Sequence, residues 1–297
     1  MIELELVKVL EGHEHPIYAL SNSQKEHIIF SGGGESAVVE WSLKTMSPIK
    51  VMYKSAGSIY FLHSPIEFPY LISGDRAGVL SIFDFISQKL IFQKQISKSA
   101  IFNIKNIQEN LYVSTEEGSL ILFDLNELKK LSELNLSSLS LRTISINNNQ
   151  LFVAGKDLNV YQINTDNFSL EKQWHAHEMP IFSSVYDRIN QQFITGARDA
   201  QIKFWFSNIE NDLPAHYFAV NDLQISNDER YLISASMDKT IKMWDLESRN
   251  LMAIADAQKN SGHTKSVNRL AISKFEDYIV SASDDKNLMV WKIKNID

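Results

Sequence analysis

Aromatic residues that close short runs of alternating apolar and polar residues recur through the whole chain at nearly constant spacing. Successive members lie roughly 38 to 47 residues apart, about 42 on average, a period in the range of repeat architectures. They are Trp41, Phe83, Phe123, Tyr161, Trp205, Trp244 and Trp291. Because self-similarity at such a period marks a chain built from copies of one supersecondary unit, we expect seven copies of that unit.

The short runs within each copy have the pattern of β-strands. They are about five or six residues long, their apolar and polar side chains alternate, and turn residues such as Asn147-Asn148-Asn149 and Asn227-Asp228-Glu229 separate them. Helical periodicity is nearly absent, and its best stretch, residues 126–134, falls where the repeat requires a strand. We therefore expect an all-β chain in which each copy forms four short antiparallel strands.

The sixth copy carries the most complete set of recurring polar residues, and the seventh copy is similar. In the sixth copy the set is His216, Ser234, Asp238 and Trp244. These copies resemble the WD40-repeat family. Copies one and five retain most of the pattern, whereas copies two to four keep the spacing and the terminal aromatic but lose the Gly-His element. The resemblance implies a seven-bladed β-propeller of four-stranded antiparallel blades.

The two ends of the chain complement each other. Only residues 292–297 follow Trp291, too few for the turn and outer strand that come after the aromatic in the other copies. An unpartnered strand pattern, residues 4–10, precedes the first copy. Pairing it with the last copy protects two exposed edges, so we expect residues 1–11 to complete the last blade and close the ring. Residues 1–297 are accordingly expected to form a single propeller domain and a monomeric ring.

The resemblance to WD40 repeats implies a buried hydrogen-bonded tetrad of His, Ser or Thr, Asp and Trp in each regular blade. Placing the hydroxyl ten and the carboxylate six residues before the aromatic gives four sets. They are His13, Ser31, Glu35 and Trp41; His177, Thr195, Asp199 and Trp205; His216, Ser234, Asp238 and Trp244; and His263, Ser281, Asp285 and Trp291. Blade two has Ala77 at the carboxylate position and blade four is shortened to Lys156-Asp157. Both are expected to lack the tetrad and to be the less stable arc.

Several residue patterns invite a catalytic or ligand-binding interpretation. The His, Ser and Asp types match a hydrolase triad, but a triad occurs once in a chain and this set recurs at the repeat period. His13/His15 and His175/His177 lack an evident third metal ligand, and Gly32-Gly33-Gly34 lacks the Lys-Ser/Thr of a phosphate loop. Because the chain also has no cysteine, we expect no catalytic residues, no cofactor and no metal, and hence a non-enzymatic protein.

Composition bears on the cellular environment and on the class of partner. No stretch approaches the roughly 20 apolar residues of a membrane-spanning helix, and residues 1–6 lack the features of a secretory signal, so we expect a cytoplasmic protein that binds no membrane. The formal net charge is −7 and no basic block offsets it, which disfavours nucleic acid. The alternative is that Arg76, Arg142 and Arg198 form a local basic patch that binds nucleic acid or an anionic membrane.

The loops at one end of the propeller are the expected functional site, because function resides in sites placed on a fold. The connections that enter each first strand and those between second and third strands meet there. In copies five and six they carry Met179, Arg198, Tyr217, Phe218 and Met237, residue types enriched at interface anchors. We expect these five residues to form one surface that binds a protein or peptide partner.

The alternative function is a small-molecule-binding or hydrolytic propeller that uses the central channel. The residue three places after each His position is small or Pro: Pro16, Ser58, Ala100, Ser140, Pro180, Ala219 and Ser266. Such a ring either leaves room for a ligand or reflects a close approach of strands to the axis, and both interpretations stay open. Because small residues bring few convergent polar groups, the scaffold function is favoured. Residues 253–261 account for the longest spacing and are interpreted as a solvated loop insertion.

Overall fold

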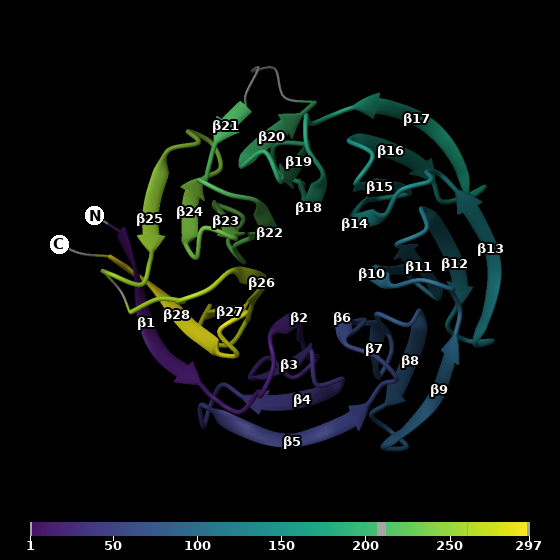
Figure 1. The fold of residues 1–297 in the computed structure, drawn as a ribbon, viewed down its shortest axis with the longest axis horizontal. Helices are drawn as coiled ribbons and strands as arrows, with labels where there is room; N and C mark the ends of the chain where they lie inside the picture. The colour runs from purple at the N-terminus through teal and green to yellow at the C-terminus, as the bar shows by residue number, and fades with distance from the viewer. Residues whose placement is uncertain (1, 207–211, 260, 296–297) are drawn as a thin grey trace.

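The computed structural model describes residues 2–206, 212–259 and 261–295. The strands in these ranges pair into seven four-stranded antiparallel sheets, which stand side by side in a ring (Figure 1). The seven-bladed β-propeller expected from the repeat is therefore confirmed.

Each of the first six blades is built from four strands that follow one another in the sequence, from the inner strand to the outer strand. Blades one to three are β2 (Ile17–Asn22), β3 (Ile28–Gly33), β4 (Ala37–Ser42), β5 (Ser47–Lys54); β6 (Ile59–His63), β7 (Tyr70–Asp75), β8 (Val79–Asp84), β9 (Lys89–Gln95); and β10 (Ile101–Ile107), β11 (Asn110–Thr115), β12 (Ser119–Asp124), β13 (Lys129–Asn135). Blades four to six are β14 (Leu141–Asn147), β15 (Gln150–Gly155), β16 (Asn159–Asn164), β17 (Ser169–His175); β18 (Ile181–Asp187), β19 (Gln192–Ala197), β20 (Gln201–Trp205), β21 (Asp212–Pro214); and β22 (Val220–Ile225), β23 (Tyr231–Ser236), β24 (Ile241–Asp245), β25 (Leu251–Ala255).

The seventh blade joins the two ends of the chain. It contains β26 (Val267–Ile272), β27 (Ile279–Ser283) and β28 (Leu288–Asn295), and its outer strand is β1 (Ile2–Leu10). The pairing runs from Ile2 opposite Asn295 to Leu10 opposite Leu288. Closure of the ring by the N-terminal strand is thus confirmed.

Burial differs between the strands because each blade packs against two neighbours. Every residue of β23 is buried, since this central strand is covered on both faces. The outer strand β17 faces solvent along most of its length. The core lies between blades: Leu4 of β1 packs with Ile241, Val267 and Trp291 at the junction of blades six and seven.

One part of the expected loop insertion is a strand. Ala253 and Ala255 are buried in β25, so the interpretation of residues 253–261 as a solvated loop is wrong for their first three positions. The start of the insertion was inferred from the repeat period, and the period does not indicate where an outer strand ends. Residue 260 lies outside the described residues.

Candidate functional site

The tetrad of blade six forms a continuous hydrogen-bond chain. Trp244 Nε1 donates to Ser234 Oγ (2.9 Å), Ser234 Oγ contacts His216 Nε2 (2.8 Å), and His216 Nδ1 contacts Asp238 Oδ2 (2.9 Å). When the imidazole is neutral and carries its proton on Nδ1, every contact in this chain has one donor and one acceptor. The polar groups of the buried set are therefore mutually satisfied.

The same chain is present in the three other blades for which a tetrad is expected. In blade five His177 contacts Asp199 (2.8 Å) and Thr195 (2.8 Å), and Trp205 donates to Thr195 (2.9 Å). The set His263, Ser281, Asp285 and Trp291 has matching contacts of 2.7 to 2.9 Å in blade seven. The set His13, Ser31, Glu35 and Trp41 is likewise joined in blade one. The longer Glu35 side chain leaves its Oε2 buried without a hydrogen bond.

The electrostatics of the blade-six tetrad keep its imidazole neutral and its carboxylate ionised. Burial lowers the pKa of His216 below 6.5, and this effect outweighs the attraction of Asp238. Burial alone would raise the pKa of Asp238, but the hydrogen bonds from His216, Thr240 and the backbone of Tyr217 hold that pKa well below 3.8. The same balance lowers the pKa of Asp199 and Asp285.

The tetrad carboxylates also position the loops at one end of the ring. Asp238 Oδ2 accepts a hydrogen bond from the backbone N–H of Tyr217 (3.1 Å), and Asp285 Oδ2 accepts one from Thr264 (3.0 Å). In blades six and seven the loop that enters the first strand is thus tied to the interior of its own blade. The buried scaffold chemistry and the exposed loops are one connected structure.

Two carboxylates form hydrogen bonds at positions that the tetrad spacing does not identify, in the two blades where Ala77 and the shortened turn break the tetrad pattern. In blade two the fully buried Asp75 accepts hydrogen bonds from Ser55 Oγ (2.8 Å) and from the backbone N–H of Gly57, Ala77 and Val79 (2.8 to 2.9 Å). In blade four the Tyr161 hydroxyl donates to Asp157. Neither Asp75 nor Asp157 lies at the tetrad spacing from the aromatic residue. The only sequence signal for them was the presence of an acidic residue near the turn.

The five residues expected to bind a partner, called the partner surface below, are all exposed. Tyr217 is 87% exposed, Phe218 59%, Met237 56% and Met179 39%, and Arg198 is exposed as well. Two backbone hydrogen bonds link their turns to the loops beside them: Arg198 N to Pro180 O (2.8 Å) and Met237 N to Ala219 O (3.0 Å). At these exposures neither Tyr217 nor Phe218 is packed between blades.

The ring of small residues lies where the turn after each second strand packs against the start of the first strand, and none of the seven lines the cavity described below. The carbonyl of each of these residues accepts a hydrogen bond from the turn after the second strand, as from Arg76 N to Ser58 O (2.9 Å). The space beside it is filled: a Cβ at Gly155 would lie 2.0 Å from Ser140 O. The small residues therefore do not line an open channel mouth.

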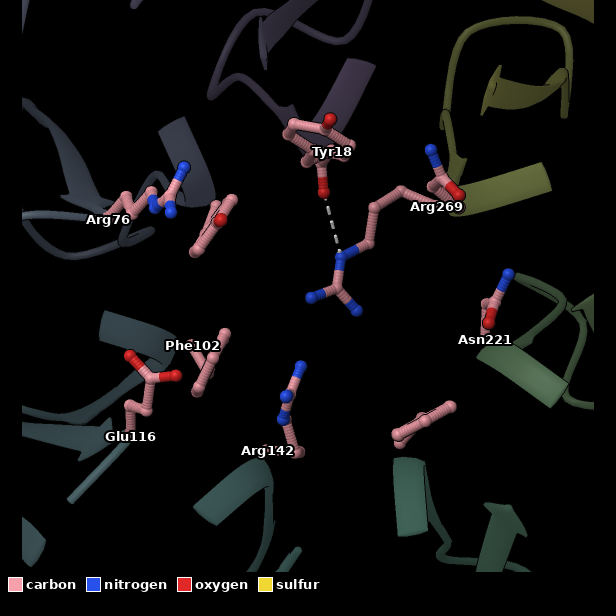
Figure 2. Close-up of a pocket in the computed structure, with 10 residues that line it drawn as sticks. Tyr18, Arg76, Phe102, Glu116, Arg142, Asn221 and Arg269 are labelled. Atoms are coloured by element: carbon pink, nitrogen blue, oxygen red, sulfur yellow. Dashed lines mark hydrogen bonds between the residues drawn. The ribbon is translucent and has the colours of Figure 1, made fainter. Parts of the chain in front are cut away.

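The residue that does face the channel lies two places further on, at a β-bulge in the first strand of every blade. In β10, for example, the register skips Phe102 between Ile101 and Asn103, and such a bulge redirects a side chain. The skipped residues are Tyr18, Tyr60, Phe102, Arg142, Phe182, Asn221 and Asn268. All seven line one cavity of about 490 Å³, together with Arg76, Glu116 and Arg269. We call this cavity the channel mouth (Figure 2).

Convergent polar groups are present at the channel mouth, contrary to the expectation from the small residues. Figure 2 shows the guanidinium groups of Arg142 and Arg269 approaching each other near its centre. Arg76 and Arg142 of the expected basic patch both line the channel mouth, whereas Arg198 belongs to the partner surface. The sequence signal that could have identified the cavity-lining residues is their constant position, two places after the small residue of each blade. The residue type at this position differs between blades, so the signal is weak.

Two further features concern metals and membranes. Among residues 2–206, 212–259 and 261–295, no three His, Asp or Glu side chains are grouped so that they would hold a metal ion. Within the same ranges, no helix is long and apolar enough to cross a membrane.

Known proteins share the repeat. The family model "WD domain, G-beta repeat" matches residues 4–42, 208–245 and 257–292. WD repeat-containing protein 55 homolog of Dictyostelium discoideum is 21% identical over 66% of this chain and 48% of its own length. Transducin beta-like protein 3 of Rattus norvegicus is 22% identical over 80% of this chain and 33% of its own length. Pre-mRNA-splicing factor PRP46 of Candida albicans is 37% identical over 25% of this chain and 20% of its own length.

This chain spans less than half the length of each of these relatives, and none of the three names denotes an enzymatic activity. The sequence matches fall at the first blade and the last two blades, each of which contains a tetrad. Together with the ring of seven four-stranded sheets, they show that the chain contains WD40 repeats in three places and folds as a seven-bladed β-propeller.

Proposed function

We propose that this chain is a non-enzymatic WD40 scaffold that binds a protein or peptide through the partner surface. One observation carries the proposal: Tyr217 is 87% exposed although its own backbone is fixed by Asp238. A large aromatic side chain held in solvent on a fixed loop loses little conformational entropy when a partner covers it.

The composition of the partner surface supports this function. Four of its five residues are aromatic or Met side chains that are at least 39% exposed, and the fifth is Arg198. Aromatic residues, Met and Arg are the types enriched at the centres of protein interfaces. All five come from loops of the adjacent blades five and six, which belong to the same end of the ring.

Names among the relatives give the proposal a cellular context. One matched protein is named a pre-mRNA-splicing factor, so a protein component of an RNA-processing assembly is the first partner to test. With a net charge of −7, a protein partner is favoured over direct contact with RNA. The cytoplasmic location, the single domain and the monomeric state stay predictions, and cell fractionation and ultracentrifugation would test the first and the last.

The test is affinity capture with the double variant Arg198→Glu, Tyr217→Ala. The wild-type chain is expected to retain a partner that this variant loses, because the variant reverses a charge and removes the most exposed ring of the partner surface. Retained proteins are identified by mass spectrometry, and binding is repeated with the purified partner. Thermal unfolding shows whether the variant is folded.

A matched control lies at the opposite end of blade five. Arg188 and Ile189 follow β18 in an exposed turn, and the variant Arg188→Glu, Ile189→Ala makes the same kind of change there. It is expected to retain the partner. Equal loss from both double variants, or retention by the folded partner-surface variant, would show that the partner binds elsewhere.

A further inference from the structure

The channel mouth holds arginines that have no acidic partner. In the described part of the chain, Arg76 and Arg142 form no salt bridge, and the Nη atoms of Arg142 have no hydrogen-bond partner. Arg142 Nε donates to Ser140 Oγ (3.1 Å), which leaves the outer edge of its guanidinium free to bind a ligand. Arginines at a cavity with unused donors are the usual basis of anion recognition.

Aromatic rings hold Arg142 in place. Its guanidinium carbon lies 3.9 Å from the centre of the Phe102 ring and 5.7 Å from that of Phe182. Phe102 in turn stacks on Tyr60, with ring centres 5.6 Å apart and an angle of 9° between the planes. Since the arginine is already ordered, binding a ligand costs little further side-chain entropy.

Like charges are held close together at the channel mouth. Burial lowers the pKa of Arg142, and the nearby charge of Arg269 lowers that pKa further, against the opposing effect of Glu116. Figure 2 shows the two guanidinium groups converging near the centre of the cavity, while Arg76 lies at its rim. An anion between them would relieve this repulsion.

The acidic groups near the channel mouth are largely engaged. Asp222 lies 3.7 Å from Arg269 and accepts a hydrogen bond from Leu270 N (2.8 Å). Asp284 accepts one from Asn268 Nδ2 (2.8 Å). Glu116 is the one acidic residue that lines the cavity, so the three lining arginines leave an excess of positive charge there.

We propose that the channel mouth binds a phosphate group. Guanidinium groups from three blades surround a cavity of about 490 Å³, and a phosphate dianion offers oxygens in several directions, whereas a carboxylate offers two in one plane. The phosphate is carried by a free small molecule or by a phosphorylated side chain. The site is distinct from the partner surface, because none of the five partner-surface residues lines it.

Calorimetry with inorganic phosphate and with O-phosphoserine tests the site at low ionic strength. The wild-type chain is expected to bind both saturably at one site. Arg76→Gln and Arg142→Gln are each expected to weaken binding about tenfold or more, because each removes a charged donor. Arg198→Gln, which removes the same charge from the same end of the ring, should change affinity less than about twofold.

Folding is controlled separately, because Arg142 packs against two aromatic rings and Arg142→Gln also removes this packing. Arg76 is exposed and forms no side-chain hydrogen bond in the described structure, so Arg76→Gln carries the test if Arg142→Gln unfolds. Absence of saturable binding to the folded wild type, or equal weakening by Arg198→Gln, would overturn the phosphate site.

A peptide series identifies the source of the phosphate. A phosphoserine peptide that binds more tightly than O-phosphoserine, while its unphosphorylated form does not bind, supports the site and assigns the phosphate to a protein partner. Equal affinity of peptide and amino acid supports the site and assigns it to a small molecule. Equal binding of both peptides overturns it. Loss of protein capture by the partner-surface variant with phosphate binding intact separates the two sites.

Discussion

At the scale of single residues, the tetrads of blades six and seven connect the interior of a blade to its exposed loop. A chain of hydrogen bonds runs from Trp244 through Ser234 and His216 to Asp238. Asp238 in turn accepts a hydrogen bond from the backbone N–H of Tyr217. A residue that looks catalytic by type therefore acts on the shape of an exposed loop. Its removal should be measurable both in stability and in the geometry of the partner surface.

Asp238→Ala should lower the free energy of unfolding by about 1–3 kcal/mol, because donors from His216, Tyr217 and Thr240 lose their buried acceptor. Urea denaturation measures the change. Glu247→Ala, at an exposed position of the same blade, is the control and should change stability by less than about 0.5 kcal/mol. An unchanged midpoint for Asp238→Ala would contradict the role given to the tetrad.

Acidification should destabilise the fold in two stages. The pKa of His216 is lowered in the folded state, so below pH 6.5 the unfolded chain takes up the proton first and stability falls. The pKa of Asp238 is also lowered in the folded state, so the stability from its ionised carboxylate is present above pH 3.8 and is lost as pH falls below it. Unfolding midpoints measured from pH 7 to pH 3 test this. A rise in stability between pH 7 and pH 5 would contradict it.

The regular tetrads could be predicted because one residue type recurs at one spacing. Asp75 could not, since its carboxylate lies two positions before the alanine that the spacing identifies, at the end of β7 instead of in the turn. Hydrogen bonds to backbone N–H groups satisfy it there without any histidine. The regular blades and blade two thus both contain a buried carboxylate that accepts hydrogen bonds, but the carboxylate comes from different positions in the sequence.

At the scale of elements, two backbone features recur in every blade although their residue types do not. A bulge in each first strand directs one side chain to the channel mouth, whether that residue is Tyr18, Arg142 or Asn221. The turn before each third strand contains a residue with positive φ. These residues are Ser36, Gly78, Gly118, Leu158, Ala200, Lys239 and Lys286. Because geometry and not residue type repeats, the channel mouth could not be predicted from sequence.

At this turn position, replacing glycine by alanine should lower the free energy of unfolding, and replacing alanine by glycine should raise it. Gly118→Ala should destabilise by about 1–3 kcal/mol, because φ is 88° and a Cβ would lie 2.0 Å from Ser137 O. Ala200→Gly should stabilise by up to about 1 kcal/mol, because it relieves a left-handed alanine at φ 66°. Thermal and urea unfolding of both variants measure the changes. Destabilisation by Ala200→Gly would show that its methyl contact outweighs the backbone strain.

At the scale of the whole molecule, the ring depends on pairing between the first strand and the last. Leu4 of β1 is fully buried in the core between blades six and seven, so this strand contributes packing as well as backbone hydrogen bonds. The end segments were predictable because a lone strand pattern at one end matched a missing strand at the other. Whether blades two and four form the less stable arc stays a prediction that hydrogen exchange would test.

Deletion of residues 1–11 should open the ring and abolish cooperative unfolding, because it exposes the edge of β28 and removes Leu4 from the core. Thermal unfolding and size-exclusion chromatography measure the effect, and a synthetic peptide of residues 1–11 should restore the transition. Leu4→Ala is the milder control and should cost about 2–5 kcal/mol while keeping the ring closed. An unchanged transition after the deletion would contradict closure by β1.

Ile2 lies directly opposite Asn295, so both ends of the described chain are neighbours on the outer rim of one blade (Figure 1). Tension applied between these two points would load the ladder of β1 and β28 one hydrogen bond at a time, as in the opening of a zipper, and would not load all of its bonds together in shear. Under such tension the seam that closes the propeller would therefore open residue pair by residue pair from its outer end. A tag or tether attached at either end would leave from this seam, away from the channel mouth.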